Sequence, residues 1–277
     1  MNKNKNIPKP PEEMVAYYKN LDEFVSNQTK NLKLVTINKV EGIEEFLKKI
    51  GKESSLLEEG YVPMDSEQVA KNFNKLVELL EASTPENQLA NSIKKLIDED
   101  VFNQKFWDKP IEEVEESVIK LAEEKELDVH SLLRLSYWAM SPYWRAVASD
   151  NKEKITDLPV NSRPTCPVCG QFADFAVLDE DKHGKRYLIC IQCDVKWPYK
   201  RMGCSYCGND DYDKLGYIVL EDVEGYKIYH CEECKTYLKT FDQRADVPRL
   251  SNNQLMENVE TLFLDLLAAE KGYSPMK

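Results

Sequence analysis

All eight cysteines of the chain lie in Cys-x-x-Cys pairs within a single stretch, residues 166–234. The four pairs are Cys166/Cys169, Cys190/Cys193, Cys204/Cys207 and Cys231/Cys234. A two-residue spacer lets two thiolates turn toward one ion, and two such pairs complete a tetrahedral sulfur site. Because no cysteine is left over, the pattern predicts two closed four-sulfur metal sites.

The order of the pairs indicates how they combine. Gly184, Cys190 and Cys193 recur as Gly225, Cys231 and Cys234, shifted relative to the first pairs by a three-residue insertion. This internal repeat favours sequential grouping, in which the first two pairs share one ion and the last two share another. A nested grouping, in which the second and third pairs meet across a short loop, is also compatible with the sequence.

The segments between the pairs carry the alternating pattern of β-hairpins. Phe175 and Val177 alternate with small or polar neighbours, a turn-rich segment follows, and Tyr187 and Ile189 alternate on the return. The second unit repeats this pattern, and an aromatic strand follows the last pair of each unit. The sequence therefore predicts two tandem ribbon modules of the zinc-ribbon or rubredoxin type.

We expect two divalent metal ions, with zinc favoured and iron as the alternative. A small β module with little apolar content needs the metal for its folding energy. Gly170 and Gly208 follow their pairs as in iron-binding knuckles, whereas Asp194 and Lys235 follow the other two and weaken the case for iron. Redox Cys-x-x-Cys motifs usually stand alone at a helix N-terminus, which disfavours dithiol chemistry here.

Composition limits the classes of partner. The formal net charge is −12, and nucleic-acid binding requires a cationic face that neutralises phosphates. The N-terminal stretch lacks the apolar region of a signal peptide, and no apolar run reaches the length of a membrane span. We therefore expect a cytoplasmic protein, no nucleic-acid partner and no membrane insertion.

The remainder of the chain reads as helices. Residues 12–148 carry periodic apolar faces separated by caps; Thr84 and Pro85 are expected to open one helix, and Pro142 is expected to kink or end another. We predict an α+β protein, with an all-helical bundle followed by the two ribbon modules and a C-terminal helix. The expected domains are a helical domain at 1–150, a linker at 151–164, a first four-cysteine ribbon at 165–201, a second at 202–244, and a C-terminal helix at 245–277 that packs back on the body.

No catalytic set is recognisable. The chain has three histidines, His130, His183 and His230, and each is expected to be solvated or structural. There is neither a phosphate-binding glycine loop nor a Gly-x-Ser-x-Gly motif. Four thiolates fill a tetrahedral ion and leave no position for water or substrate, so metal-assisted hydrolysis is not expected. The sequence thus favours a non-enzymatic protein.

An ordered set of residues in the C-terminal half resembles a known family. The set comprises CPVCG at 166–170, Arg186-Tyr187-Leu188-x-Cys190, Cys193 with Trp197 and Arg201, Cys204-x-x-Cys207, and CEECKTYLK at 231–239. It resembles the FdhE family of formate dehydrogenase accessory proteins over about residues 160–275. One departure is Pro198, which stands where family members have a histidine after the tryptophan.

The resemblance implies a function that the residues alone do not. Family members are cytoplasmic, have a helical N-terminal domain and two metal modules, and are needed to form active formate dehydrogenase. They act on its catalytic subunit before export, so the implied partner is that subunit. The alternatives are a rubredoxin-like iron electron carrier serving the same maturation and, less favoured, a nucleic-acid-binding zinc-ribbon protein.

Six side chains of the ribbons are candidates for the partner-binding surface. They are Arg186, Tyr187, Trp197, Arg201, Tyr237 and Lys239. The three cations are plausible contacts because a partner with carboxylates would complement them. The competing interpretation is hairpin packing, which is favoured for Tyr187 and Trp197 because each ribbon has little other apolar material.

Overall fold

The computed structural model describes residues 7–34, 45–47, 54–83, 87–160, 163–180, 183–221 and 223–276. The chain divides into two compact units. One is formed by Glu12–Val40 and Gly60–Val147, and the other by Met1–Pro11, Glu41–Glu59 and Ala148–Lys277. The first unit is helical, and the second contains the sheet and both groups of cysteines.

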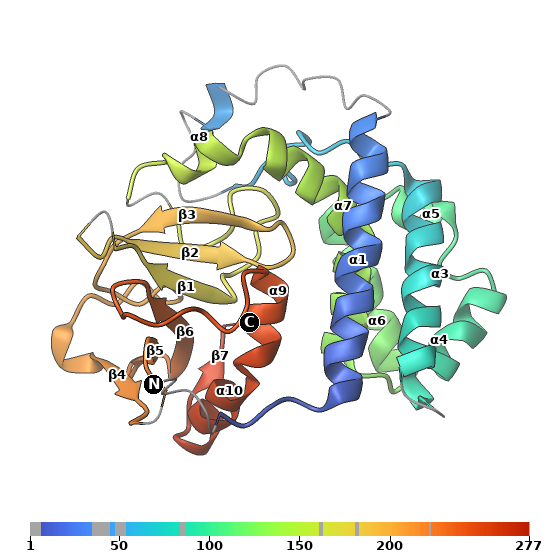
Figure 1. Ribbon diagram of the computed structural model, residues 1–277. Helices are drawn as coiled ribbons and strands as arrows, with labels where there is room; N and C mark the ends of the chain where they lie inside the picture. Colours follow the sequence, from blue (N-terminus) through green and yellow to red (C-terminus); the bar gives the residue numbers. More distant parts are fainter. Residues whose placement is uncertain are drawn as a thin grey trace. The chain divides into compact units, whose positions relative to one another are not determined.

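The helical unit is built from amphipathic segments that bury one face each. Its helices are α1 (Glu12–Leu34), α3 (Ser66–Ser83), α4 (Gln88–Asp98), α5 (Gln104–Trp107), α6 (Ile111–Glu124) and most of α7 (Val129–Asp150) (Figure 1). Phe73 on α3 is fully buried, and its ring lies 4.5 Å from that of Phe102 and 5.1 Å from that of Trp107, measured between centroids. This aromatic cluster joins α3 to the segment around α5.

Two local expectations about helix ends differ from the structure or lie outside it. Of the two outcomes expected at Pro142, a kink or an end, the structure rules out the end, because helix α7 continues through it to Asp150. A proline removes one helical hydrogen bond, and burial of α7 offsets that loss, since Trp138 and Trp144 are almost fully buried. Thr84 and Pro85 lie outside the described residues; α4 begins at Gln88, where the side chain of Asn87 accepts a hydrogen bond from the Ala90 N–H.

The two ribbon modules share a single sheet. Strands β1 (Phe175–Leu178), β2 (Arg186–Cys190) and β3 (Val195–Tyr199) form one antiparallel meander, and β4 (Leu215–Val219), β5 (Tyr226–Cys231) and β6 (Thr236–Asp242) form the other. The strand order is β3-β2-β1-β6-β5-β4, because β1 pairs in parallel with β6, and β7 (Ser274–Pro275) also pairs with β6. The parallel β1–β6 pairing therefore fixes one module against the other.

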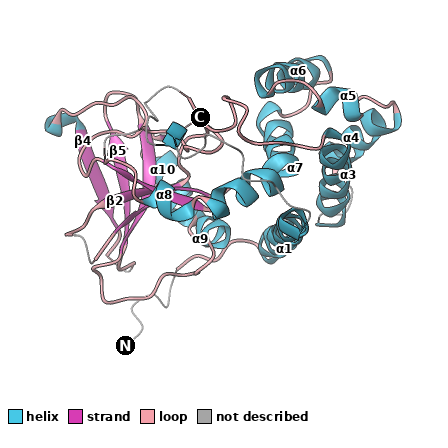
Figure 2. Cartoon of the chain, turned by 90° about the horizontal axis from the view of Figure 1, so that it is seen from above, coloured by secondary structure: helices cyan, strands magenta, loops and turns pink. Residues whose placement is uncertain are grey.

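The C-terminal helices α9 (Gln254–Glu260) and α10 (Leu262–Glu270) lie against one face of this sheet (Figures 1 and 2), and α10 contacts β6. Their apolar side chains join those of both meanders in one core. It includes Phe175, Val177, Tyr187, Ile189, Tyr226, Ile228, Phe241, Phe263 and Leu264. The core thus belongs to the two modules and the C-terminal helices together.

A short helix and two backbone hydrogen bonds connect other segments of the same unit to the first module. Helix α8 (Lys152–Thr156), in the segment expected as a linker, packs on β3 and buries Ile155 fully. The N–H groups of Leu56 and Leu57 donate to the carbonyls of Pro167 and Val168, each at 2.9 Å.

The predicted fold class is confirmed: a helical N-terminal region precedes a sheet with two four-cysteine groups and C-terminal helices. None of the helices in the described part of the chain has the length and apolar character of a membrane span.

Candidate metal centres

The first cysteine cluster is formed by Cys166, Cys169, Cys190 and Cys193. One ligand atom from each lies within 4.8 Å of the others, and the Sγ atoms of Cys169 and Cys190 are 3.7 Å apart. Cys190 ends β2, Cys193 lies in the turn between β2 and β3, and Cys166 and Cys169 lie in the segment before β1. All four side chains are buried.

The second cluster brings together Cys204, Cys207, Cys231 and Cys234 with the same closeness. The Sγ atoms of Cys204 and Cys234 are 3.6 Å apart, and those of Cys207 and Cys231 are 3.8 Å apart. Unlike the first cluster, it reaches the surface, because Cys207 is exposed and Cys234 is partly exposed. The structure thus groups the pairs sequentially, one cluster in each module.

The sulfur positions fit a tetrahedral metal ion. Four thiolates about 2.3 Å from a central ion would be separated by roughly 3.8 Å. Three Sγ–Sγ separations, of 3.6 to 3.8 Å, match this value, the others lie within 4.8 Å, and all eight thiols are free of disulfides. A tetrahedral set of four sulfurs suits zinc or iron. Each cluster could therefore hold one ion of either metal.

All four knuckles share one backbone conformation. Gly170 and Gly208, which follow the second cysteine of their pairs, have φ of 79° and 76°. Asp194 and Lys235 occupy the same position in the other two pairs and have φ of 55° and 56°. The left-handed conformation that glycine favours is thus adopted at every knuckle. The two non-glycine residues therefore do not discriminate between zinc and iron.

Three polar neighbours of the second cluster were not found by sequence reasoning. The Tyr206 N–H donates to Cys204 Sγ at 3.4 Å, and the Asn209 side-chain amide donates to Cys231 Sγ at 3.6 Å. The Thr236 hydroxyl lies 3.0 Å from Cys234 Sγ. Each neighbour stands two residues after a cysteine, which is the signal that could have identified it. Such contacts orient metal-binding thiolates and tune their charge.

Burial and hydrogen bonds between the thiols shift the pKa values of the cysteines in the first cluster. Burial raises the pKa of Cys190 and Cys193 well above the usual range, and hydrogen bonds to the neighbouring thiols add to the increase at both. At Cys166 burial acts in the same direction, but hydrogen bonds from the other three thiols outweigh it and lower the pKa well below its usual value. A metal ion entering this cluster must therefore displace protons.

In the second, partly exposed cluster, the pKa values of two thiols are shifted in opposite directions. Partial burial and the thiols of Cys234 and Cys204 raise the pKa of Cys207 to about 12. Partial burial acts against ionisation at Cys234 too, but hydrogen bonds from Thr236 lower its pKa to about 7. Cys234 therefore ionises more readily than Cys207.

Five of the six residues expected at a partner surface are buried. Tyr187, Trp197, Arg186 and Lys239 are at most 3% exposed, and Tyr237 is 7% exposed. The Trp197 indole donates to the Arg163 carbonyl at 3.0 Å, and Tyr187 belongs to the sheet core. For these two residues the structure agrees with hairpin packing.

Two of the three candidate cations, Arg186 and Lys239, are buried as well. Lys239 is buried because its ammonium group pairs with Asp265 at 2.8 Å and donates to the Asn258 carbonyl at 2.9 Å. The Arg186 guanidinium donates to the Gly203 carbonyl at 2.9 Å. Arg201 is the one partly exposed member of the set. Arg186, Arg201 and Tyr237 nevertheless line a common cavity beside the second cluster.

The cysteine modules are similar to characterised sequences. Residues 165–201, which contain the first cluster, match the model of the FdhE central domain. A protein FdhE homolog from Aquifex aeolicus is 36% identical over 113 residues, which are 39% of this chain and 38% of the relative. Protein FdhE from Escherichia coli K12 is 31% identical over 138 residues, covering 49% of this chain and 43% of that protein. The resemblance to the FdhE family is thus confirmed over as much as half of the chain.

The fold extends the likeness beyond the aligned residues. The crystal structure of the FdhE protein from Pseudomonas aeruginosa superposes with a TM-score of 0.57 and covers 97% of this chain and 95% of that chain, at 17% sequence identity. At that identity the match establishes a common fold and no more. The aligned segments span less than half the length of the curated FdhE relatives described above.

Proposed function

We propose that the chain is a non-enzymatic accessory factor that binds the catalytic subunit of formate dehydrogenase in the cytoplasm while that enzyme is assembled. The resemblance to FdhE proteins is the observation that carries this proposal. The two metal centres have structural roles in it, one in each ribbon module. Because four thiolates saturate each ion, the ions hold the modules in shape and act on no substrate.

The architecture supports a binding role. Both modules lie in one sheet with a common core, so their surfaces keep a fixed relative geometry. Such pre-organisation lowers the entropic cost of holding a partner. The client is accordingly expected to meet a rigid surface of the sheet unit.

Affinity purification tests the proposal. The full chain, tagged and metal-loaded, is expressed in its own host without oxygen and recovered at low salt, and bound proteins are identified by mass spectrometry. Enrichment of a formate dehydrogenase catalytic subunit over a tag-only control is expected. If the subunit is not enriched while other proteins are, the proposed client is wrong.

The exposure of the second cluster favours one alternative. Cys207 is open to solvent, and a solvent-facing iron centre could exchange electrons with a partner protein, as rubredoxin-like carriers do. An iron-loaded chain would absorb visible light through thiolate-to-iron charge transfer. A colourless chain with two zinc ions would exclude the carrier function.

A further inference from the structure

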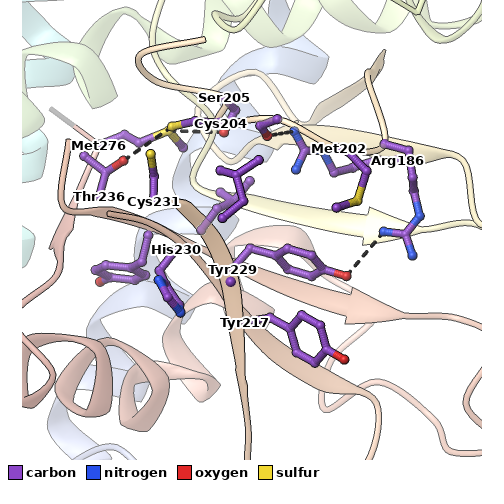
Figure 3. Close-up of a pocket in the computed structure, with 16 residues that line it drawn as sticks. Arg186, Met202, Cys204, Ser205, Tyr217, Tyr229, His230, Cys231, Thr236 and Met276 are labelled. Carbon is purple, nitrogen blue, oxygen red and sulfur yellow. Dashed lines mark hydrogen bonds between the residues drawn. The ribbon is translucent and has the colours of Figure 1, made fainter. Parts of the chain in front are cut away.

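A cavity of about 170 Å³ lies beside the second cysteine cluster. A buried space of about 150 Å³ can hold a benzene molecule, so this one has room for a single small side chain. Figure 3 shows the sulfur atoms of Cys204 and Cys231 at one end of the lining and the ring of Tyr217 toward the other. Among the residues that form the wall are Arg186, Arg201, Met202, Tyr217, Tyr229 and Leu238.

Arg186 brings a buried charge to this wall. Its side chain is only 3% exposed, and its guanidinium lies 5.1 Å from the centroid of the Tyr199 ring. One Nη donates to the Gly203 carbonyl, but the buried Nε has no hydrogen-bond partner. Within the described ranges, no carboxylate pairs with it. An open donor on a buried charge is costly, and an acceptor placed in the cavity would relieve that cost.

Arg201 places a second guanidinium at the same cavity. Its Nη1 lies 3.3 Å from the Tyr229 hydroxyl, and no ion pair to it is seen in the part of the chain that the structure describes. Burial lowers the pKa of Arg186 to about 10, and the positive charge of Arg201 contributes in the same direction. Guanidinium groups keep their charge in proteins at neutral pH, so the cavity offers two like charges to one anion.

A metal ion bound in the second cluster would not provide the acceptor that the Nε of Arg186 lacks. An ion with four thiolates carries a net negative charge and would attract Arg186, since the Cys204 thiolate already acts on it. The guanidinium has five N–H donors in a fixed fork, however, and the free Nε requires an acceptor in its own plane. A carboxylate satisfies that geometry with two oxygens.

The other walls indicate what carries the carboxylate. Met202, Leu215 and Leu238 are apolar, and the Tyr217 and Tyr229 rings lie 5.7 Å apart. A free inorganic anion would leave this apolar surface uncovered. The chain also has a net charge of −12, which disfavours small anions at long range. The walls therefore suit a carboxylate attached to an apolar or peptide group.

Strand β4 forms the edge of the sheet next to the cavity. Within the described residues it pairs only with β5. The Glu232 N–H donates to the Lys214 carbonyl, and paired residues alternate along antiparallel strands, so the backbone groups of Tyr217 and Val219 point to the open edge. The N–H of Leu215, at the start of the strand, already donates to the Tyr212 carbonyl. The side chains of Tyr217 and Val219 are 59% and 54% exposed. Such an edge can accept an additional strand.

We propose that β4 and the adjoining cavity form a recognition site for an extended segment of the client, which adds to β4 as a strand and places an acidic side chain against Arg186 and Arg201. This inference rests on the proposed function, because it supplies the site by which a client polypeptide is held. The strand contributes backbone hydrogen bonds, and the cavity contributes selectivity for a carboxylate.

Calorimetric titration of the full, metal-loaded chain tests the site. The probe is an end-blocked pentapeptide, Val-Glu-Val-Tyr-Val, and the matched control has glutamine in place of glutamate. We expect the glutamate peptide to bind about tenfold or more tightly than the control, as one charge-assisted hydrogen bond would give. Equal affinities, or no binding of the glutamate peptide at millimolar concentration, would overturn the inference.

Sodium acetate and sodium phosphate distinguish the source of the anion. We expect acetate to compete weakly and phosphate not to compete. If phosphate binds more tightly than the peptide, the cavity is a site for small anions and the peptide inference is wrong.

Variants locate the binding. Arg201→Gln is expected to lower affinity for the glutamate peptide about tenfold and to leave the glutamine peptide unaffected. Arg201→Lys, which keeps the charge but loses the fork, should fall between. The control is Arg134→Gln, which removes the same charge from an exposed position in α7. Equal peptide affinity in Arg201→Gln and Arg134→Gln, with two metal ions retained in each, would contradict the assignment.

Affinity purification with the same variants separates this inference from the proposed function. If the unaltered chain and Arg201→Gln capture the catalytic subunit equally, the cavity is not the client site and the accessory function stands. If the unaltered chain captures no such subunit, the client assignment fails, and the peptide titration alone decides whether the cavity recognises carboxylates.

Discussion

The buried ammonium group of Lys239 lies 2.8 Å from a carboxylate oxygen of Asp265, so an ion pair joins β6 of the second module to helix α10. Lys239 is 2% exposed, and the Tyr237 hydroxyl donates to the other oxygen of Asp265 at 2.7 Å. The C-terminal helices are thus bound to the sheet by a charged contact as well as by the apolar core.

Removing the negative partner should therefore be costly. Asp265→Asn leaves the Lys239 charge buried without a counter-charge, and we expect the free energy of unfolding to fall by about 3 kcal/mol. Urea unfolding, followed by circular dichroism, measures the change. The control is Asp246→Asn, which alters an exposed carboxylate and should shift stability by less than about 0.5 kcal/mol. Equal effects of the two substitutions would show that the ion pair contributes little.

The two metal centres should differ in their resistance to chelation. All four thiols of the first cluster are buried, whereas Cys207 in the second is exposed. Excess EDTA should therefore release one ion per chain quickly and the other slowly, as a chromogenic metal indicator would record. In Cys207→Ser only the slowly released ion should be left. A single release phase for both ions would contradict the difference in burial.

The pH dependence of stability should include a contribution from Asp242. Hydrogen bonds from Arg244 and Lys227 hold the pKa of its carboxyl well below the usual range, although burial opposes them. The unfolded chain therefore binds more protons than the folded chain in acid, and the contribution is present above about pH 4 and is lost as the pH falls further.

Comparison with Asp242→Asn isolates this contribution. The difference in free energy of unfolding between the unaltered chain and the variant should be constant from pH 7 to about pH 5 and should shrink below about pH 4. Measuring both proteins at each pH cancels effects of acid on the metal centres. A difference that stays constant down to pH 3 would rule out the shifted carboxyl.

The helical unit should depend on the aromatic cluster around Phe73. Its side chain is fully buried against Phe102 and Trp107, so Phe73→Ala should cost about 3 to 5 kcal/mol, and Phe73→Leu clearly less. Metal analysis should still find two ions per chain, because both clusters belong to the other unit. Loss of metal from Phe73→Ala would show that the two units fold as one.

Local sequence patterns were sufficient to predict the modules. A two-residue spacer constrains both cysteines of a pair, and the alternation around Phe175 and Tyr187 predicts strands, although both faces of β1 and β2 are buried in the structure. The repeat of this pattern favoured the sequential grouping that the structure adopts. These features depend on neighbours a few residues apart, which the sequence shows directly.

Long-range contacts could not be predicted in this way. No local pattern indicates that β1 pairs in parallel with β6, about 60 residues further on, and this pairing makes one sheet from two modules. Lys239 was expected at a surface because its partner, Asp265, stands 26 positions away. The burial of Arg186 was likewise not predicted, since its carbonyl acceptor on Gly203 lies 17 positions further along the chain. The burial of a charged residue cannot be predicted from sequence when its partner lies far along the chain.

X-ray absorption at the metal edge of the purified full chain tests the central claim, that eight cysteines form two closed metal centres, most directly. With two ions per chain by elemental analysis, we predict four sulfur neighbours per ion at about 2.3 Å and no nitrogen or oxygen neighbour. A nitrogen or oxygen ligand, or fewer than two ions in a folded chain whose cysteines are all reduced, would contradict the claim.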